Sequence, residues 1–345
     1  MSRKDAVTNR RTLISAAALA VLSLAVTASA WAQQPAKLPR VAMLAPLAPT
    51  AKACAANPEG PSLPCFLDAM RELGYVDGKN VSFEFRFAAE DYGKLPALAT
   101  ELVGLKPDVI YTTGPGAAAV ASATTTIPIV VGSVGEEMLM RFAGDFAHPI
   151  GNMTGFTLVS GEQERKCLQF LKELAPPIAR VVLLLNPDSP GSGDYPARLA
   201  PAAAQLGMTL LRIEARNGSD LPHAFAAIAA SGANAIYLID DPALAGVTDV
   251  RRQIIERALS QRLPLASPNS NVAPDGGLVS FGTDRAVLAR RAAIYVDKIL
   301  KGAKPADLPV ERPSVFKVSV NVKTAKALGL TIPPSLLHRA DEVIQ

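Results

Sequence analysis

The sequence predicts an α/β protein built from two lobes, each an open parallel sheet with helices on both faces. Short apolar runs rich in β-branched residues alternate along the chain with Ala-rich segments of helical spacing. Aromatic residues make up only 5% of the chain, a balance that suits helices packed on a parallel sheet better than a β-sandwich. The wholly apolar run 181–185 is typical of a strand buried on both faces of such a sheet.

The first part of the chain, up to about residue 155, contains four or five strand–helix units. Residues 81–87 alternate Val and Phe with polar residues, which predicts a half-exposed strand near a sheet edge. Apolar residues recur at helical spacing on one face of segment 95–105. The expected strands are 41–44, 81–87, 109–112 and 129–131, and the expected helices are 66–73, 95–105 and 117–123.

The same alternation repeats after residue 155. The expected strands are 181–185, 209–213, 235–239 and 263–266, and the expected helices are 162–174, 194–206, 221–230 and 249–261. Strands separated by helices of this length imply right-handed crossovers and parallel sheets. A strand at 278–281, a long amphipathic helix at 285–300 and a last strand at 316–320 follow.

This repetition predicts two lobes joined by a hinge of several strands. We expect residues 151–155 to make the first crossing, and helix 285–300 to be added to the first lobe before the chain returns. Lobe 1 then comprises 38–154 with 282–308, and lobe 2 comprises 155–281 with 309–345.

The first 32 residues have the pattern of a secretory leader. Four basic residues precede an uncharged run from 13 to 26, and Ala30-Trp31-Ala32 offers a small-residue cleavage pattern, so we expect cleavage after Ala32 and a periplasmic location. The alternative is an uncleaved membrane anchor, although the run is shorter than the ~20 residues a spanning helix needs. Without this segment, which holds four basic residues and one acidic residue, the formal net charge falls from +4 to +1. We therefore expect no nucleic-acid partner, and no membrane insertion of the mature chain.

The chain has three cysteines. Cys54 and Cys65 flank a Pro- and Gly-rich loop, and in an oxidising compartment they can form a disulfide; the alternative is two free thiols. Cys167 lies in a helical pattern and is expected to be a small core residue.

Motifs for catalysis and for cofactors are lacking in the sequence. No G-x-S-x-G elbow, Walker A motif or Cys/His cluster occurs, and the three histidines are isolated. Gly114-Pro115-Gly116 follows a strand and opens a helix, but Ala119 replaces the third glycine of a dinucleotide fingerprint. We expect no enzyme activity, no cofactor and no metal. The glycine-rich turn instead exposes backbone N–H groups that favour an anionic group such as a carboxylate.

Candidate ligand-binding residues follow the strands of both sheets. In open parallel sheets ligands bind beyond the carboxyl ends of the strands, and a hinge would bring the two sets of loops into one cleft. Lobe 1 then offers hydroxyl and N–H groups for a carboxylate, and lobe 2 offers Asp240 or Asp241 for an ammonium group. Ordinary helix capping is the alternative explanation for these residue types. The candidates are Ala45, Pro46, Thr113, Gly114, Ser133, Glu136, Asn186, Asp188, Asp240, Asp241 and Asn269.

Several segments resemble one large family. Residues 295–311 read YVDKILKGAKPADLPVE, 321–330 read NVKTAKALGL, 331–337 read TIPPSLL and 71–80 read RELGYVDGKN. Together these resemble the ABC-transporter substrate-binding proteins related to the tryptophan/tyrosine-type uptake proteins. The resemblance implies a type I periplasmic-binding-protein fold with two Rossmann-like lobes and three crossovers, a membrane permease as partner, and no catalysis. Glu136-Glu137 stands where the family often has Asp-Pro, and the Cys54–Cys65 loop is not a feature of the family.

The expected function is that of a periplasmic solute-binding component of an ABC uptake system. The ligand would be a small molecule, an amino acid or another carboxylate, bound between the lobes of a monomer. The alternative is a sensor subunit for a chemoreceptor or histidine kinase, which would use the same clamp with a different docking surface.

Overall fold

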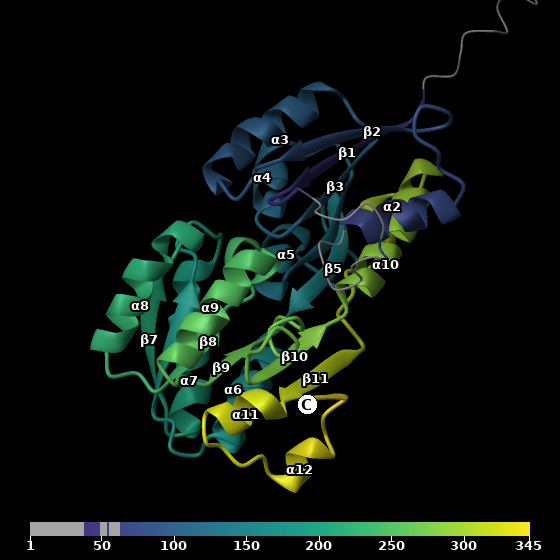
Figure 1. Cartoon of the computed structure of the whole chain (residues 1–345). Coiled ribbons are helices and arrows are strands. Elements are labelled where there is room, and N and C mark those ends of the chain that lie inside the picture. The colour runs from purple at the N-terminus through teal and green to yellow at the C-terminus, as the bar shows by residue number, and fades with distance from the viewer. Residues whose placement is uncertain (1–37, 49–53, 55–62) are drawn as a thin grey trace, which may run out of the picture. The chain divides into compact units, whose positions relative to one another are not determined.

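The structure, a computed structural model, describes residues 38–48, 54 and 63–345 (Figure 1). The predicted leader, residues 1–32, and residues 55–62 of the loop between the cysteines lie outside the described residues. Residues 39–345 form one compact unit that contains two sheets. Its helices, within the described residues, include none that is long and apolar enough to cross a membrane.

The first sheet has five parallel strands in the order β2-β1-β3-β4-β5. Alternate residues of β1 face opposite sides: Val41 and Met43 pack beneath α2 and α10, whereas Ala42 and Leu44 pack beneath α3, α4 and α5. Because both faces of the sheet are covered by helices, both sets of alternating side chains are buried, and the central strands are therefore continuous apolar runs in the sequence. The elements are β1 (Arg40–Ala45), α2 (Leu63–Glu72), β2 (Ser82–Phe87), α3 (Leu95–Gly104), β3 (Val109–Thr113), α4 (Gly116–Ala123), β4 (Ile129–Gly135), α5 (Glu136–Ala143), β5 (Met153–Val159) and α10 (Arg285–Leu300).

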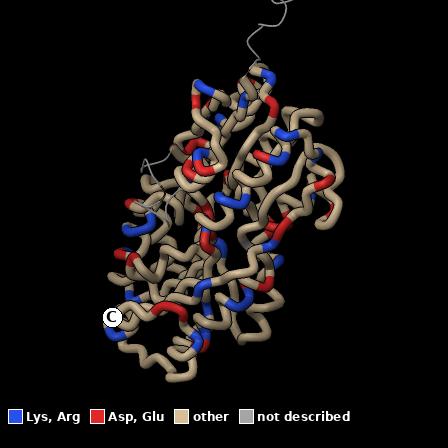
Figure 2. Tube along the Cα trace, turned by 90° about the vertical axis from the view of Figure 1, so that its right-hand side faces the viewer, with Lys and Arg blue, Asp and Glu red and all other residues tan. Residues whose placement is uncertain are grey.

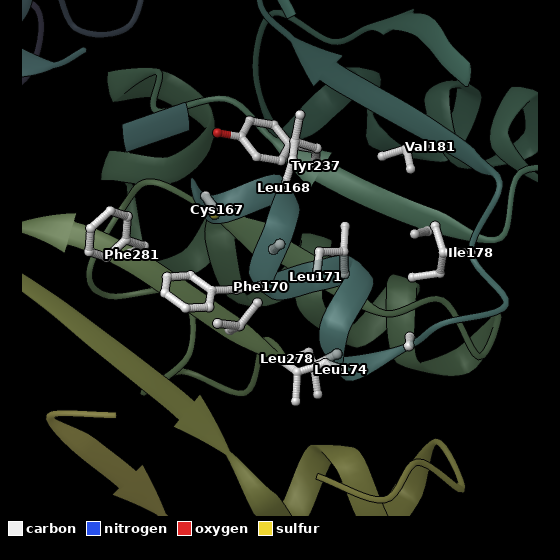
Figure 3. Packing of buried hydrophobic residues seen from close by; sticks show 14 of the residues in the cluster. Cys167, Leu168, Phe170, Leu171, Leu174, Ile178, Val181, Tyr237, Leu278 and Phe281 are labelled. Carbon is white, nitrogen blue, oxygen red and sulfur yellow. The ribbon is translucent and has the colours of Figure 1, made fainter. Parts of the chain in front are cut away.

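The second sheet has seven strands in the order β12-β11-β10-β9-β8-β6-β7, parallel except for the antiparallel pair β10–β11. Figure 3 shows one of its two cores, which includes Cys167 and Leu171 of α6 and Tyr237 of β8. Cys167 is buried with a free thiol, which confirms its expected place in the core. The elements are α6 (Gly161–Leu174), β6 (Arg180–Leu185), α7 (Tyr195–Gln205), β7 (Thr209–Glu214), α8 (Leu221–Ala230), β8 (Ala235–Leu238), α9 (Thr248–Ser260), β9 (Leu265–Ser267), β10 (Val279–Thr283), β11 (Phe316–Asn321), α11 (Val322–Ala327), α12 (Pro334–Leu337) and β12 (Glu342–Ile344).

Short helical segments complete the two lobes. They are η2 (Tyr92–Lys94), η3 (Ser192–Asp194), η4 (Gly218–Asp220), η5 (Pro242–Gly246) and η6 (Pro305–Asp307). The predicted fold class, an α/β protein with two sheets of mostly parallel strands, is confirmed.

The chain passes between the sheets three times, but the crossings lie later than predicted. Strand β5 belongs to the first sheet through residue 159, so the first crossing follows it instead of falling at 151–155. Strand β10 extends the second lobe to Thr283, two residues beyond the predicted boundary at residue 281. Glu311 still pairs with the first lobe, because its N–H donates to Gly155 O (2.9 Å) and its carbonyl accepts from Thr157 N–H (2.9 Å). The third crossing therefore lies between Glu311 and Phe316.

Gly155 explains why β5 was not recognised in the sequence. Its φ is +142°, and a Cβ there would lie 2.1 Å from the carbonyl oxygen of Val131 on β4. The register of β4 and β5 is irregular beyond this pair. A glycine that resembles a turn signal therefore allows a close approach of two strands.

Candidate functional site

Both sheets contain the same order of five strands, so the point at which the winding of the strands reverses falls at corresponding strands in each sheet. The first sheet runs β2-β1-β3-β4-β5, and the second contains the corresponding order β7-β6-β8-β9-β10. In sheets of this order, ligands bind at the carboxyl ends of the two strands where the winding reverses. Those strands are β1 and β3, ending at Ala45 and Thr113, and β6 and β8, ending at Leu185 and Leu238.

A cavity of about 500 Å³ lies at these strand ends and is lined by residues of both lobes. This volume is in the range of small-molecule sites. Ten of the eleven candidate residues line it: Ala45, Pro46, Thr113, Gly114, Ser133, Glu136, Asn186, Asp240, Asp241 and Asn269. The exception is Asp188, which does not line the cavity; its carboxylate pairs with Arg216 (3.2 Å), and both side chains are more than half exposed.

The lobes contact each other beside the predicted glycine-rich turn. Gly114 has φ +54°, and a Cβ at this position would lie 3.3 Å from Cγ of Pro242 in η5 of the other lobe. The buried Tyr92 hydroxyl accepts a hydrogen bond from Ala243 N–H (3.0 Å) and lies 3.2 Å from both carboxylate oxygens of Asp241. The structure therefore shows a closed arrangement in which η5 is packed on the first lobe.

Asp240 lines the cavity and already has a cationic partner. Its carboxylate pairs with Arg285, at the start of α10, and accepts a hydrogen bond from Asn269 Nδ2 (2.8 Å). The side chain of Asp240 is only 2% exposed. The cation that neutralises this carboxylate stands 45 residues away in the sequence, and the role predicted for Asp240 or Asp241 toward an ammonium group stays a prediction.

Asp241 is buried and accepts hydrogen bonds from the backbone of η5. Ala243 N–H (2.9 Å) and Leu244 N–H (3.2 Å) both donate to Oδ1, so the capping role that was the alternative explanation is present. Burial raises the pKa of Asp241 to about 6, although these hydrogen bonds oppose the shift. Asp241 lines the cavity as well, so it is both a cap and part of the wall.

A carboxylate–guanidinium–carboxylate triad crosses the cavity wall. Arg198 of α7 pairs with Glu164 of α6 (2.9 Å) on its own lobe and with Glu137 of α5 (2.9 Å) on the other lobe. Its guanidinium lies 4.1 Å from the ring centroid of Tyr195. Burial raises the pKa of Glu164, while the Arg198 charge lowers it. Two carboxylates share one cation, so the triad carries a net negative charge when both are ionised.

Glu136 and Arg141 complete the charged lining. Glu136 pairs with Arg312 (2.7 Å) of the third crossing. Arg141, one turn after Glu137 on α5, lines the cavity, and no carboxylate of the described residues forms an ion pair with it. Figure 2 shows acidic and basic residues interspersed along the whole described chain, with no surface of a single sign. The charge of the cavity wall therefore depends on the individual ion pairs described above.

Sequence reasoning missed five charged residues of this wall. They are Glu137, Arg141, Glu164, Arg198 and Arg285. All lie on helices that begin at the carboxyl edges of the sheets. Four of them are in the first turns of these helices, which was the signal available, whereas Arg141 is in the last turn of α5. Helix α5 itself was not predicted, because it has only eight residues, although the two glutamates in its first turn are a helix-start signal.

Apolar side chains supply much of the remaining lining. They come from both lobes and include Leu47, Leu63, Tyr111, Val134, Met138, Met140, Leu158, Leu185 and Ile239. The cavity is therefore amphipathic, with charged groups at defined positions in an apolar wall. Among the described residues there is no group of three or more His, Cys, Asp or Glu side chains that could hold a metal ion.

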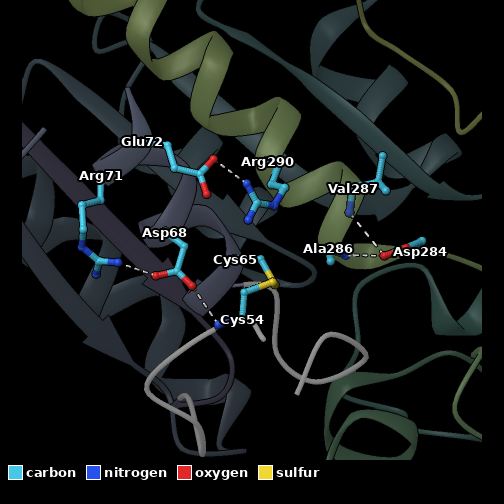
Figure 4. Close-up of a disulfide and its surroundings, with 9 residues drawn as sticks. All are labelled: Cys54, Cys65, Asp68, Arg71, Glu72, Asp284, Ala286, Val287 and Arg290. Atoms are coloured by element: carbon cyan, nitrogen blue, oxygen red, sulfur yellow. Dashed lines mark hydrogen bonds and ion pairs between the residues drawn. A yellow bond between two sulfur atoms is a disulfide. The ribbon is translucent and has the colours of Figure 1, made fainter. Parts of the chain in front are cut away.

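A disulfide lies close to one end of this lining. Cys54 and Cys65 are bonded, and Cys65 is in the first turn of α2, two residues after the cavity residue Leu63 (Figure 4). The Asp68 carboxylate accepts a hydrogen bond from Cys54 N–H (2.9 Å), and this bond lowers the pKa of Asp68. The disulfide and this hydrogen bond both attach Cys54 to α2.

Two parallel-sheet lobes around one amphipathic cavity define a two-lobed α/β solute-binding protein. The family model described as ABC transporter substrate binding protein matches residues 62–344. The chain belongs to this family, which confirms the resemblance noted in its sequence. Proteins of this family supply small molecules to membrane permeases, and they work typically in the periplasm or outside the cell.

Relatives and solved structures agree with this assignment. A tyrosine-binding protein of Clostridioides difficile strain R20291 is 23% identical over 266 residues, which is 77% of this chain and 75% of the relative. A conserved domain protein of Vibrio cholerae O1 biovar El Tor has a TM-score of 0.78 at 27% identity, covering 89% of this chain and 100% of its own. A Streptococcus pneumoniae ABC domain in complex with L-Trp has a TM-score of 0.77 at 24% identity, with the same coverage.

Proposed function

We propose that this chain captures a small amphipathic carboxylate of amino-acid type in the inter-lobe cavity and delivers it unchanged to a membrane permease. The carrying observation is Arg141, a cation on the cavity wall with no carboxylate partner among the described residues. Glu137, four residues earlier on the same helix, pairs with Arg198 instead. Arg141 is therefore left to bind an anionic solute group.

The rest of the wall supports an amino acid. Thr113 and Gly114 stand before the N-terminus of α4, where N–H groups and the helix dipole favour a carboxylate. Asp240 and Asp241, which the sequence predicts as partners of an ammonium group, both line the cavity. The apolar lining suits a hydrophobic side chain, and the relative named as tyrosine-binding agrees with this class.

Location and assembly form part of the same proposal. The chain is exported by its first 32 residues, cleaved after Ala32, and acts as a periplasmic monomer without catalysis.

Isothermal titration calorimetry tests the solute class. We expect L-tyrosine or L-tryptophan to bind, and tyramine and tryptamine, which lack the carboxylate, to fail. Arg141→Gln should weaken amino-acid binding about tenfold or more, because a charged hydrogen-bonded partner is removed. Arg165→Gln, an exposed cation on α6 outside the cavity lining, should leave affinity unchanged.

Two results would contradict the proposal. The first is folded protein that binds no amphipathic carboxylate from a broad set. The second is binding that is indifferent to Arg141→Gln. Recovery of a chemically altered solute after incubation would overturn the non-catalytic part.

A further inference from the structure

We propose that Arg198 is a closure latch, and that its bond to Glu137 sets how long the solute is retained. The retention part rests on the proposed function. The closure part does not, because it concerns only the two lobes.

One end of the latch is fixed on its own lobe. Arg198 Nε and Nη2 donate to the two carboxylate oxygens of Glu164, at 3.2 and 2.9 Å, and the guanidinium is stacked on Tyr195. The Glu164 side chain is only 1% exposed, so without Arg198 it would be a buried carboxylate with no cation beside it. This requirement holds the guanidinium in place whether the lobes are open or closed.

The other end reaches across the cavity. The remaining nitrogen, Nη1, donates to Glu137 Oε2 (2.9 Å) in the first turn of α5. The Glu137 side chain is 53% exposed, and α5 belongs to the first lobe. When the lobes part, Glu137 is hydrated by water at little cost, while Glu164 keeps its partner. The Arg198–Glu137 bond therefore contributes to the closed form alone.

The position of this bond connects it to retention. Glu137, Arg198 and Glu164 all line the cavity, so separation of Glu137 from Arg198 opens the cavity wall. A contact that forms after closure stabilises the bound state and has little effect on the encounter, and such contacts act mainly on dissociation rates. The buried contact between Tyr92 and Asp241 is a separate link between the lobes and is untouched by changes at Glu137.

Glu137→Gln is the variant that breaks the latch without stranding a buried charge. We expect it to raise the dissociation rate of L-tyrosine about two- to fivefold in stopped-flow measurements, the range for a partly exposed ion pair. The association rate should change less. In 1 M NaCl the difference between the wild type and the variant should shrink, because salt screens the pair that only the wild type has.

Glu101→Gln is a closely matched control. Glu101 pairs with Arg86 (2.6 Å) with side-chain exposures of 52% and 28%, against 53% and 30% for Glu137 and Arg198. This pair lies within the first lobe, between α3 and β2, and neither residue lines the cavity. Its loss should leave both rates unchanged.

Closure is measured separately with labels on Thr100→Cys and Ser260→Cys, two exposed positions on opposite lobes. We expect the Glu137→Gln protein without solute to show a larger open population in pulsed electron spin resonance distances. If that shift occurs but no solute binds the wild type, the latch stands and the proposed function fails. An unchanged distance distribution would overturn the latch, and an unchanged L-tyrosine dissociation rate would overturn its role in retention.

Discussion

At the scale of single residues, Asp241 links the charge of the site to the stability of the fold. It is 2% exposed and lies between the backbone of η5 and the Tyr92 hydroxyl. Burial raises its pKa to about 6 from a usual value of 3.8. The folded protein therefore binds this proton more tightly than the unfolded chain does. The contribution of Asp241 to stability is most favourable below pH 4 and falls as the pH rises to 6.

We expect Asp241→Asn to remove this dependence. A shift of about two pKa units corresponds to about 3 kcal/mol, so the stability of the variant relative to the wild type should rise by up to that amount between pH 4 and 7. Above pH 7 the difference should be constant. Urea unfolding at a series of pH values measures it. A relative stability that falls with rising pH would show that the site favours the ionised carboxylate.

At the scale of elements, the Cys54–Cys65 disulfide is the clearest test of a local constraint. The bond joins residues 11 positions apart and ties Cys54 to α2. Closing a loop of this length is worth about 3 kcal/mol by restricting the unfolded chain. We expect Cys54→Ser/Cys65→Ser, or a reductant acting on the wild type, to lower the free energy of unfolding by about this amount.

Urea unfolding with and without a thiol reductant checks this. The double variant serves as its own control, because the reductant should no longer affect it. Wild-type stability that is insensitive to full reduction would contradict the expectation.

The elements that the sequence predicted are those with strong periodicity. Strands such as β3 and β6 are buried on both faces, and α10 was predicted at its observed bounds. Strand β5 was missed because Gly155 resembles a turn signal. The loop residues at the strand ends were placed at the cavity by topology alone.

Charge pairing in the site could not be predicted from the sequence. Asp240 and Arg285 are 45 residues apart, and Arg198 and Glu137 are 61 apart and on different lobes. Only the folded chain decides which cation meets which carboxylate. Arg141 is informative for the same reason. Among the described residues no carboxylate pairs with it, because Glu137, four residues earlier, pairs with Arg198.

At the scale of the whole molecule, cleavage of the proposed leader is the next test. When the complete chain is expressed with export, we expect the mass of the periplasmic product to match residues 33–345. Trp31 is the only tryptophan, so the same product should show no emission when excited at 295 nm. A full-length mass in the membrane fraction would instead indicate the uncleaved anchor.

The interleaving of the lobes has a consequence for how the chain is made. The first lobe is not continuous, because α10 covers its sheet together with α2; Arg290 pairs with Glu72, and the Tyr75 hydroxyl donates to Asp297, 222 residues away. A nascent chain shorter than about 300 residues lacks part of this core, so the first lobe cannot finish folding while the rest of the chain is being synthesised. Contacts of such sequence separation fold slowly. A polypeptide that stays incomplete until its end has emerged is suited to be threaded across a membrane before it becomes compact.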